Sequence, residues 1–413
     1  MNHNAPILIP VSAIQAARKL LTRIRFEHAQ RHVLSHVLAT VDATGLTLAV
    51  TDLKHWLETR IPVTITPEAS FRFLIPAAGM AAAIRGDKGT SVSFDTSGHS
   101  DNSALKVVVT RGGILTESFY NSGTAWDFPT RPTFDGRLTN VPKETMLALQ
   151  TVAGCASTDA SWPILNGVLF SPDDEGVLIA TNRILLAGAP ARFAGRQFIL
   201  PNVGVHVLGF PDFIARDAAI LQPEGADKEA EELRVQFRSG PHTLIATAIA
   251  GNYPNYRKVI PREFLADATF PEMQRSAVIS WLKSLDGRSP TVRFSWETPG
   301  HLTLTHWDSG TAQATIRVPI SVSGEDQPPA IAFKSRYLAD ALSIGNTLRL
   351  TDGVSPGMMT DASGKYCVIM PCRVTDEIVD EPAEEVADNN AHCVAPSENN
   401  TRIHTGGTED SQL

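Results

Sequence analysis

Residues 37–52 read VLATVDATGLTLAVTD, and the same pattern returns as VLFSPDDEGVLIATN at 168–182 and as VRFSWETPGHLTLTHWD at 292–308. In each copy a valine precedes a glycine by eight residues, and alternating apolar and polar residues typical of a strand follow. The copies begin 131 and 124 residues apart. A repeat at this spacing predicts that the chain consists of duplicated domains.

A second pattern recurs out of step with the first. It reads FLIPAAGMAAAIRG at 73–86, FILPNVGVHVLGF at 198–210 and IAFKSRYLADALS at 331–343. Each copy is a short apolar stretch followed by a helix rich in alanine or leucine, and Pro76 and Pro201 stand where a first helical turn accepts proline. Two interleaved repeats predict three similar domains of about 120–130 residues.

The predicted fold class is α+β, with mainly antiparallel sheet and two helices in each domain. The first helices are expected at 11–23, 142–155 and 271–285, and the second at 76–85, 201–210 and 334–344. The expected domains cover residues 1–132, 137–261 and 265–374. Residues 375–413 hold ten acidic residues and one basic residue, so this stretch is expected to be an acidic, disordered tail.

Composition and motifs exclude several classes of protein. No apolar run is long enough to span a bilayer, and the N-terminus lacks the basic region of a secretory signal. The four cysteines form no CxxC pair, which favours the reducing cytoplasm and no membrane partner. GxxxxGK[ST], GxSxG and HExxH are all absent, so we expect neither catalysis nor a cofactor.

A zinc site is the main alternative function that the sequence motifs suggest. His28, His32 and His36 have the spacing that would place three imidazoles on one face of a helix. However, Val33, Leu34, Val37 and Leu38 indicate a strand, on which these rings lie too far apart to bind one ion. No metal is therefore predicted.

Several motifs, in this order, resemble those of the bacterial sliding clamp, the beta subunit of the replicative DNA polymerase. TAWDFPTRP (124–132), WPILNGVLF (162–170), IATN (179–182), GNYPNYRKVIP (251–261) and YCVIMPCRV (366–374) carry the resemblance, which covers residues 1–374. Any one of these phrases is a weak signal, but the last two together are specific. Proteins of this family have three similar domains, which agrees with the threefold repeat in this sequence.

The resemblance implies a homodimer closed head to tail into a ring of six domains. Strands would form the outside of the ring, and the helices would line a hole for duplex DNA, contacted without regard to sequence. Such a clamp has no chemistry of its own and gives processivity in DNA replication. It tethers DNA polymerase, and it binds peptides of the polymerase and of the clamp loader in an apolar pocket between the second and third domains.

Two sets of site residues follow from the resemblance. The partner-peptide pocket would comprise Leu165, Thr181, Leu186, Pro254, Lys258, Val259, Val368, Ile369, Met370, Pro371, Cys372 and Arg373. The DNA-facing residues would be Arg18, Lys19, Arg23, Arg85, Lys143, Arg275, Lys283, Lys334 and Arg336. The plainer interpretations are buried strand residues for the first set and a solvated helix surface for the second.

The chain also departs from the family pattern. Where the family usually has Thr-Asp-Gly-His-Arg-Leu, residues 181–186 read TNRILL, and the position before Pro163 is Trp162 rather than arginine. The 39 residues after Val374 are an extension beyond the usual end. These departures leave open a second interpretation, a module with the clamp fold that binds partner peptides but does not load onto DNA.

Overall fold

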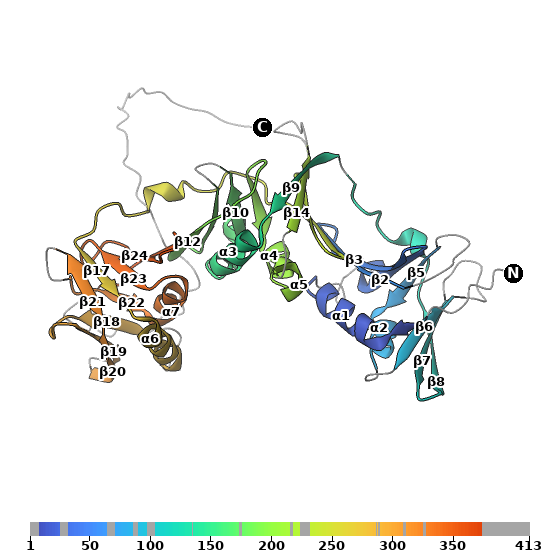
Figure 1. Ribbon diagram of the computed structural model, residues 1–413, viewed down its shortest axis with the longest axis horizontal. Coiled ribbons are helices and arrows are strands. Elements are labelled where there is room, and N and C mark those ends of the chain that lie inside the picture. The colour runs from blue at the N-terminus through green and yellow to red at the C-terminus, as the bar shows by residue number, and fades with distance from the viewer. Residues whose placement is uncertain are drawn as a thin grey trace, which may run out of the picture. The chain divides into compact units, whose positions relative to one another are not determined.

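The computed structural model of the chain describes residues 8–24, 32–63, 71–85, 90–96, 104–133, 135–172, 176–214, 218–223, 232–285, 287, 290–308, 311–324 and 328–373. By internal contacts the chain divides into two units, Met1–Val374 and Thr375–Leu413. The first unit is shown in Figure 1 with its labelled helices and strands. The predicted acidic tail lies outside the described residues.

The first large sheet joins strands from two distant parts of the chain. Its eight antiparallel strands follow the order β5 (Phe71–Pro76), β2 (His36–Asp42), β3 (Gly45–Thr51), β4 (His55–Ile61), β16 (His242–Thr247), β15 (Arg234–Ser239), β14 (Ala218–Pro223) and β9 (Gly136–Val141). The join between β4 and β16 is here called the first seam, and Trp56 is paired with Ile245 across it.

The second large sheet is built in the same way. Its order is β13 (Phe198–Pro201), β10 (Gly167–Ser171), β11 (Val177–Thr181), β12 (Leu185–Pro190), β25 (Tyr366–Ile369), β24 (Gly357–Thr360), β23 (Thr347–Leu350), β17 (Ala266–Thr269) and β21 (Ser321–Gly324). The join between β12 and β25 is the second seam, where Leu186 is paired with Val368. Apart from β21, the two large sheets have the same arrangement.

Two four-stranded sheets complete the strands of the described residues. One has the order β1 (Ile9–Pro10), β6 (Ser91–Asp95), β7 (Ala104–Arg111) and β8 (Ile114–Asn121). The other has the order β20 (Thr311–Pro319), β19 (His301–Asp308), β18 (Thr291–Ser295) and β22 (Ala332–Lys334). Each corresponds to one half of a large sheet, so the three sequence repeats form the same set of strands.

Six helices of the described residues lie where the sequence predicts them, and a short one at Pro211–Ile214 was not predicted. They are α1 (Val11–Leu21), α2 (Ala77–Ala83), α3 (Lys143–Ala153), α4 (Asn202–Leu208), α5 (Pro211–Ile214), α6 (Glu272–Ser284) and α7 (Ser335–Ile344). They pack as the pairs α1 with α2, α3 with α4, and α6 with α7, as Figure 1 shows most clearly for the first and last pairs. The α+β fold with repeated domains is therefore confirmed.

Proline marks the start of most of these helices. Pro10, Pro76, Pro142, Pro201 and Pro271 each occupy the N-cap position with an extended ψ between 130° and 158°. Pro76 and Pro201 thus stand just before the first turn instead of inside it. Proline is tolerated there because its fixed φ suits the start of a helix and its missing N–H would have no partner inside the helix.

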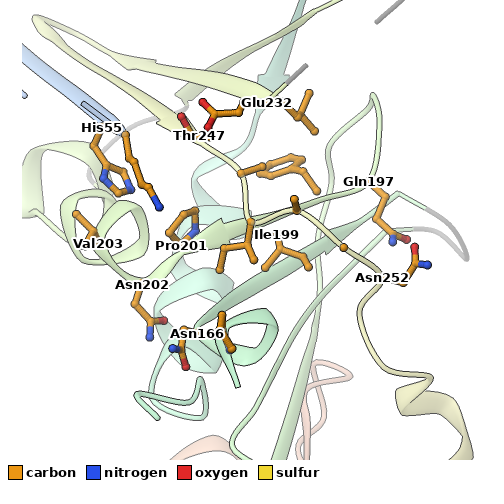
Figure 2. Close-up of a pocket in the computed structure, with 18 of the residues that line it drawn as sticks. His55, Asn166, Gln197, Ile199, Pro201, Asn202, Val203, Glu232, Thr247 and Asn252 are labelled. Carbon is orange, nitrogen blue, oxygen red and sulfur yellow. The ribbon is translucent and has the colours of Figure 1, made fainter. Parts of the chain in front are cut away.

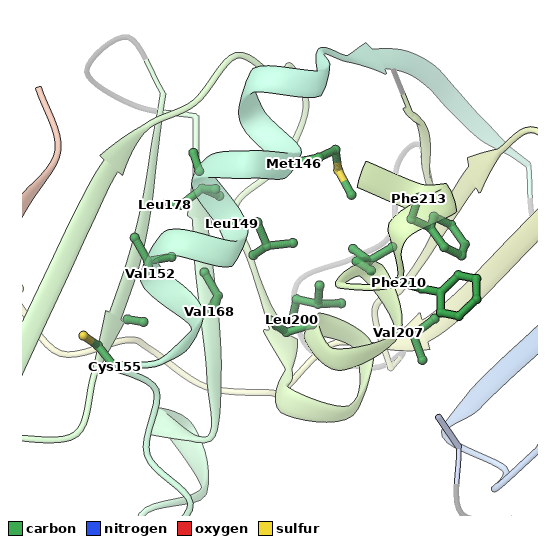
Figure 3. Packing of buried hydrophobic residues seen from close by; sticks show 14 of the residues in the cluster. Met146, Leu149, Val152, Cys155, Val168, Leu178, Leu200, Val207, Phe210 and Phe213 are labelled. Carbon is green, nitrogen blue, oxygen red and sulfur yellow. The ribbon is translucent and has the colours of Figure 1, made fainter. Parts of the chain in front are cut away.

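The buried side chains form one large core and two small satellite clusters. On α3, Met146, Leu149 and Val152 pack into the large core with Val168 and Leu200, as Figure 3 shows. The satellite cluster at the first seam contains Leu38, Ala49, Trp56, Leu74, Ala125, Phe128 and Ile245. The one at the second seam contains Leu169, Ile179, Leu186, Ile199, Tyr256 and Val368. The matching order of these two lists shows that the duplication extends to packing.

Candidate functional site

Four of the predicted pocket residues are buried, but only Leu186 and Val368 belong to the satellite cluster at the second seam and form a floor there, whereas Ile369 packs in the large core. Leu165, Leu186, Val368 and Ile369 are each at most 5% exposed. Strand pairing places Leu186 opposite Val368 and Leu185 opposite Ile369. These side chains are buried because both strands are internal to the nine-stranded sheet. The floor is thus made by residues more than 180 positions apart in sequence.

Apolar side chains above this floor remain open to solvent. Val259 is 51% exposed, Met370 is 44% exposed and Ile184 is 36% exposed. The backbone N–H of Met370 donates a hydrogen bond to the carbonyl of Ile184 at 3.0 Å, which brings these two residues together. Unbranched methionine adapts to differently shaped partners. The seam therefore offers an apolar surface suited to docking another chain.

A tight turn at residues 181–185 supports one wall of the site. The Thr181 hydroxyl donates to the carbonyl of Leu185 at 2.6 Å and accepts from the backbone N–H of Arg183 at 3.1 Å. Arg183 has a φ of 78°, a conformation that favours glycine, the residue that the family usually has here. Its guanidinium lies 4.8 Å from the ring centre of Trp162, which is 46% exposed. In place of the family's usual Gly-His-Arg, this wall therefore carries an exposed cation–π pair between Arg183 and Trp162.

The remaining predicted pocket residues lie at the edges of the site. Pro254, Lys258 and Arg373 are exposed, and Pro371 and Cys372 are half-buried. The Cys372 N–H donates to the carbonyl of Ala332 at 2.7 Å, which ties the end of the described chain to β22. The 3₁₀ helix Tyr256–Lys258 reaches the floor through Tyr256.

Sequence reasoning missed several residues of this surface. Ile184, Tyr253, Tyr256 and Tyr366 all pack at the seam or on its exposed side. Burial raises the pKa of both Tyr253 and Tyr366 above the usual value for a tyrosine. Both Tyr253 and Tyr256 stand inside the GNYPNYRKVIP motif, which was the available signal. None of the twelve predicted pocket residues lines the cavities of about 1060, 770 and 260 Å³, although Tyr366 lines the second of these.

The predicted DNA-facing residues fall into two groups. Six are exposed, namely Lys19, Arg85, Lys143, Lys283, Lys334 and Arg336. The other three, Arg18, Arg23 and Arg275, are half-buried and engaged within the protein. Arg23 Nη1 lies 2.9 Å from His206 Nε2, and Arg275 donates to the carbonyl of Leu342 at 3.2 Å and to Glu272 at 2.7 Å. Arg18, Arg23 and Arg275 are therefore less available to a phosphate than the exposed group.

The histidine spacing considered for zinc does not form a helix. His28 lies outside the described residues, His32 begins a 3₁₀ helix (His32–Ser35), and His36 begins β2. His36 is buried, and its Nδ1 lies 2.9 Å from the carbonyl oxygen of His32. Burial lowers the pKa of His36. Within the described part of the chain, no group of three or more His, Cys, Asp or Glu side chains could hold a metal ion.

Comparison with known proteins gives a consistent result. No protein-family model matches the chain. The chain is 24% identical over 403 residues to the beta sliding clamp of Synechocystis, covering 88% of this chain and 98% of that protein. It is 25% identical over 368 residues to the beta sliding clamp of Caulobacter vibrioides, covering 83% and 92%. Among the described residues, no helix is long and apolar enough to cross a membrane.

Solved structures show the same likeness in the fold. The DnaN sliding clamp of Bartonella birtlesii, solved with bound griselimycin, matches with a TM-score of 0.75 at 21% identity and covers 90% of this chain and 100% of its own. The sliding clamp of Bacillus subtilis matches with a TM-score of 0.75 at 16% identity and the same coverage.

Repeated domains that share sheets across two seams, with a pair of helices in each domain, define the clamp class of fold. The similarity extends over nearly the full length of the relatives. Together the sequence and structure comparisons support a divergent relative of the bacterial beta sliding clamps.

Proposed function

We propose that this protein is a DNA sliding clamp, which encircles duplex DNA as a homodimeric ring and tethers DNA polymerase and other partners without catalysing a reaction. The observation that carries the proposal is that each four-stranded sheet matches only one half of a large sheet. Strands β5-β2-β3-β4 and β13-β10-β11-β12 each continue across a seam into the second half of the next domain. Strands β22-β18-β19-β20 have the same arrangement but end at β20.

The missing continuation of β20 has a counterpart at the other end of the chain. Strands β8-β7-β6-β1 correspond to β16-β15-β14-β9, and within the described residues β8 has a strand neighbour on one side only. Ile114, Leu115 and Phe119 on β8 are 72%, 65% and 73% exposed. An exposed, apolar edge strand readily pairs with another chain. Pairing of β8 with β20 of a second copy would form a third seam, and doing so twice closes a ring.

The exposed basic residues support binding of DNA inside such a ring. Lys19 lies on α1 and Lys283 on α6, while Arg85 follows α2 directly. If helices line the hole, these cations meet phosphates, which supply affinity without sequence specificity. A ring holds DNA by topology, so each of these contacts needs to contribute little.

The apolar surface at the second seam is the proposed docking site for partner peptides. Its buried floor and exposed Met370, Val259 and Ile184 suit an extended or helical segment with apolar anchors. Docking there would tether the polymerase or the clamp loader. We propose that the three clamp domains of the chain span residues 1–132, 137–261 and 265–374. The comparisons do not favour the alternative of a clamp-fold module that does not load onto DNA.

Mass in solution tests ring closure directly. Light scattering over a range of concentrations is expected to give a stable mass twice the 44.6 kDa of one chain. The double change Leu115→Lys with Phe119→Lys puts charges on the edge of β8 and is expected to yield the monomer. The change Trp126→Lys, at a side chain 89% exposed and outside β8, is the matched control and should leave the dimer intact. A monomeric unaltered protein at micromolar concentration would contradict the proposal.

A further inference from the structure

A cavity of about 1060 Å³ opens beside the first seam, where Lys54, His55 and Thr247 are among its lining residues. Its floor is apolar and comes from β13 and from residues 248–252, which follow β16. In Figure 2, Ile199 and Pro201 lie between His55 on one side and Gln197 on the other, with Thr247 and Glu232 above them. We call this cavity the first-seam groove.

Backbone hydrogen bonds show that the first-seam groove duplicates the docking surface at the second seam. The N–H of Thr247 donates to the carbonyl of Lys54 at 2.9 Å, as Met370 donates to Ile184 at 3.0 Å. The N–H of Ile249 donates to Ile199 at 3.0 Å, as Cys372 donates to Ala332 at 2.7 Å. Thr247 and Ile249 therefore occupy the positions that Met370 and Cys372 occupy at the second seam.

The turns beside the two surfaces are duplicated as well. Leu53 and Arg183 both have a φ of 78°. Each turn holds a threonine hydroxyl that donates to the carbonyl four residues later, at 2.7 Å for Thr51 and 2.6 Å for Thr181. Lys54 therefore has the position of Ile184. The duplicated surface is the more polar of the two, because a lysine replaces an isoleucine and a threonine replaces a methionine.

We propose that the first-seam groove is a second docking site, which binds an extended peptide segment carrying an acidic side chain next to an apolar one. The proposal shares the idea of peptide docking with the function proposed above. It concerns a different surface and a different peptide chemistry.

The lining of the groove fits an extended peptide. Ile199, Val203, Leu233 and Ile249 supply an apolar floor for a side chain, and the volume is in the range of ligand-binding clefts. Four side-chain amides surround them, from Asn166, Gln197, Asn202 and Asn252. Amides both donate and accept hydrogen bonds, as a peptide backbone requires. The Oδ1 atom of Asn166 is buried without a hydrogen-bond partner in the described structure, so this acceptor is still unsatisfied.

The charges around the groove favour an acidic side chain. Lys54 is exposed and has no ion-pair partner among the described residues, and Arg196 adds a second cation to the lining. Two acids lie nearby, and one of them, Glu232, also lines the groove; each has a partner of its own. Asp52 accepts from His55 Nδ1 at 2.9 Å, and Glu232 lies 3.7 Å from Arg234. A carboxylate on the ligand would form an ion pair with Lys54.

Two labelled peptides test the proposal with the full-length protein. The acidic probe is fluorescein-Gly-Gly-Asp-Leu-Leu-Gly-amide, and the basic probe has lysine in place of aspartate. Fluorescence anisotropy is expected to show binding of the acidic probe and much weaker binding of the basic one. Lys54→Glu should weaken the acidic probe by about tenfold or more and strengthen the basic probe, because the charge complementarity is reversed. Val203→Arg, on the floor, should weaken both.

Controls separate this site from the second seam. Met370→Glu changes the second-seam surface, so both probes are measured in this background, where the remaining binding reports on the first-seam groove. Lys365→Glu, at the turn between β24 and β25, is the charge control and should leave the acidic probe bound. In the Met370→Glu background, unchanged acidic binding after Lys54→Glu, equal binding of both probes, or no binding of either would overturn the proposal. None of these outcomes alters the mass in solution, so failure here remains distinguishable from failure of the ring.

Discussion

Gly188 shows how closely a side chain approaches the backbone of the facing strand at the second seam. It lies in β12 opposite Tyr366 of β25. A Cβ atom at this position would overlap the Tyr366 ring and its hydroxyl. Glycine is therefore required by a neighbour 178 positions away, not by the local backbone. The Tyr366 ring covers the backbone of β12 because glycine leaves that space open.

We expect Gly188→Ala to lower the free energy of unfolding by about 1–3 kcal/mol, since the added methyl group overpacks the seam. Urea unfolding measures the effect. Adding Tyr366→Ala removes the overlapping ring, so the double change should cost less than the sum of the two single changes. Gly154→Ala is the control, because nothing lies within 4 Å of its added Cβ atom. Additive costs in the double variant would refute the steric explanation.

His36 makes the stability of the protein depend on pH. Its side chain is 1% exposed, and its Nε2 is buried without a hydrogen-bond partner in the described structure. Burial lowers the pKa of His36 below 6.5, because the charged ring is poorly solvated there. Between the folded and the unfolded pKa, the unfolded chain binds a proton that the native protein does not.

Native stability is therefore expected to fall as the pH drops below about 6.5. In His36→Leu the loss between pH 7.5 and pH 5.5 should be smaller, because one titrating group with a lowered pKa is gone. Urea unfolding at both pH values gives the comparison. Equal losses in the unaltered protein and in His36→Leu would show that other groups cause the dependence.

At the scale of elements, the duplicated turns after β3 and β11 are built from side chains instead of glycine. Thr51 and Asp52 bind the backbone of the first turn, and Thr181 and Asn182 bind that of the second. These hydrogen bonds hold Leu53 and Arg183 at a φ of 78°. A non-glycine residue in this conformation costs roughly 1–2 kcal/mol. The turns persist because the flanking strands on either side are paired.

Leu53→Gly is therefore expected to be neutral or to stabilise the protein by about 1 kcal/mol, because glycine adopts this conformation freely. Leu53→Val should instead destabilise it by about 1–2 kcal/mol, since a branched Cβ fits a positive φ worst. Thermal or urea unfolding distinguishes the two variants. The side chain is 50% exposed, so lost packing contributes little to either result. A valine variant as stable as the unaltered protein would contradict this account.

At the scale of the whole molecule, the exposed lysines and arginines determine how the proposed ring meets DNA. The structure favours Lys19, Arg85 and Lys283 over Arg18, Arg23 and Arg275, because the first three are exposed. Arg23 instead links the first and second domains through His206. Its guanidinium also lies over the ring of Phe210, 5.8 Å from the ring centre.

Changing Lys19, Arg85 and Lys283 together to glutamate should weaken binding to duplex DNA at every sequence. The slope of log affinity against log salt should fall in magnitude by about two to three, because each lost phosphate contact accounts for about 0.9. Anisotropy of a labelled duplex at several salt concentrations measures this slope. Lys365→Glu, at the turn between β24 and β25, is the matched control. An unchanged slope in the triple variant would place the DNA contacts elsewhere.

Local elements were well predicted by the sequence, but the composition of the sites was not. Each of the six main helices begins within two residues of its expected start, because proline and apolar periodicity act over a few residues. The motifs put Leu186 and Val368 in one predicted pocket, and the structure pairs these two residues across the second seam. The sequence did not predict the position of Ile184, the Arg183–Trp162 pair or the first-seam groove, because each depends on segments that meet only in the folded chain.

The sequence alone determined that this protein has three similar α+β domains and an acidic extension. Those features follow from hydrophobic period, turn residues and charge, which are local properties of the chain. Only the tertiary structure decided which half-sheets join, which cations stay exposed and where a cavity opens. Strand pairing across the seams connects residues more than 120 positions apart. Every residue except proline offers the same backbone donor and acceptor, so the sequence does not reveal which strands pair.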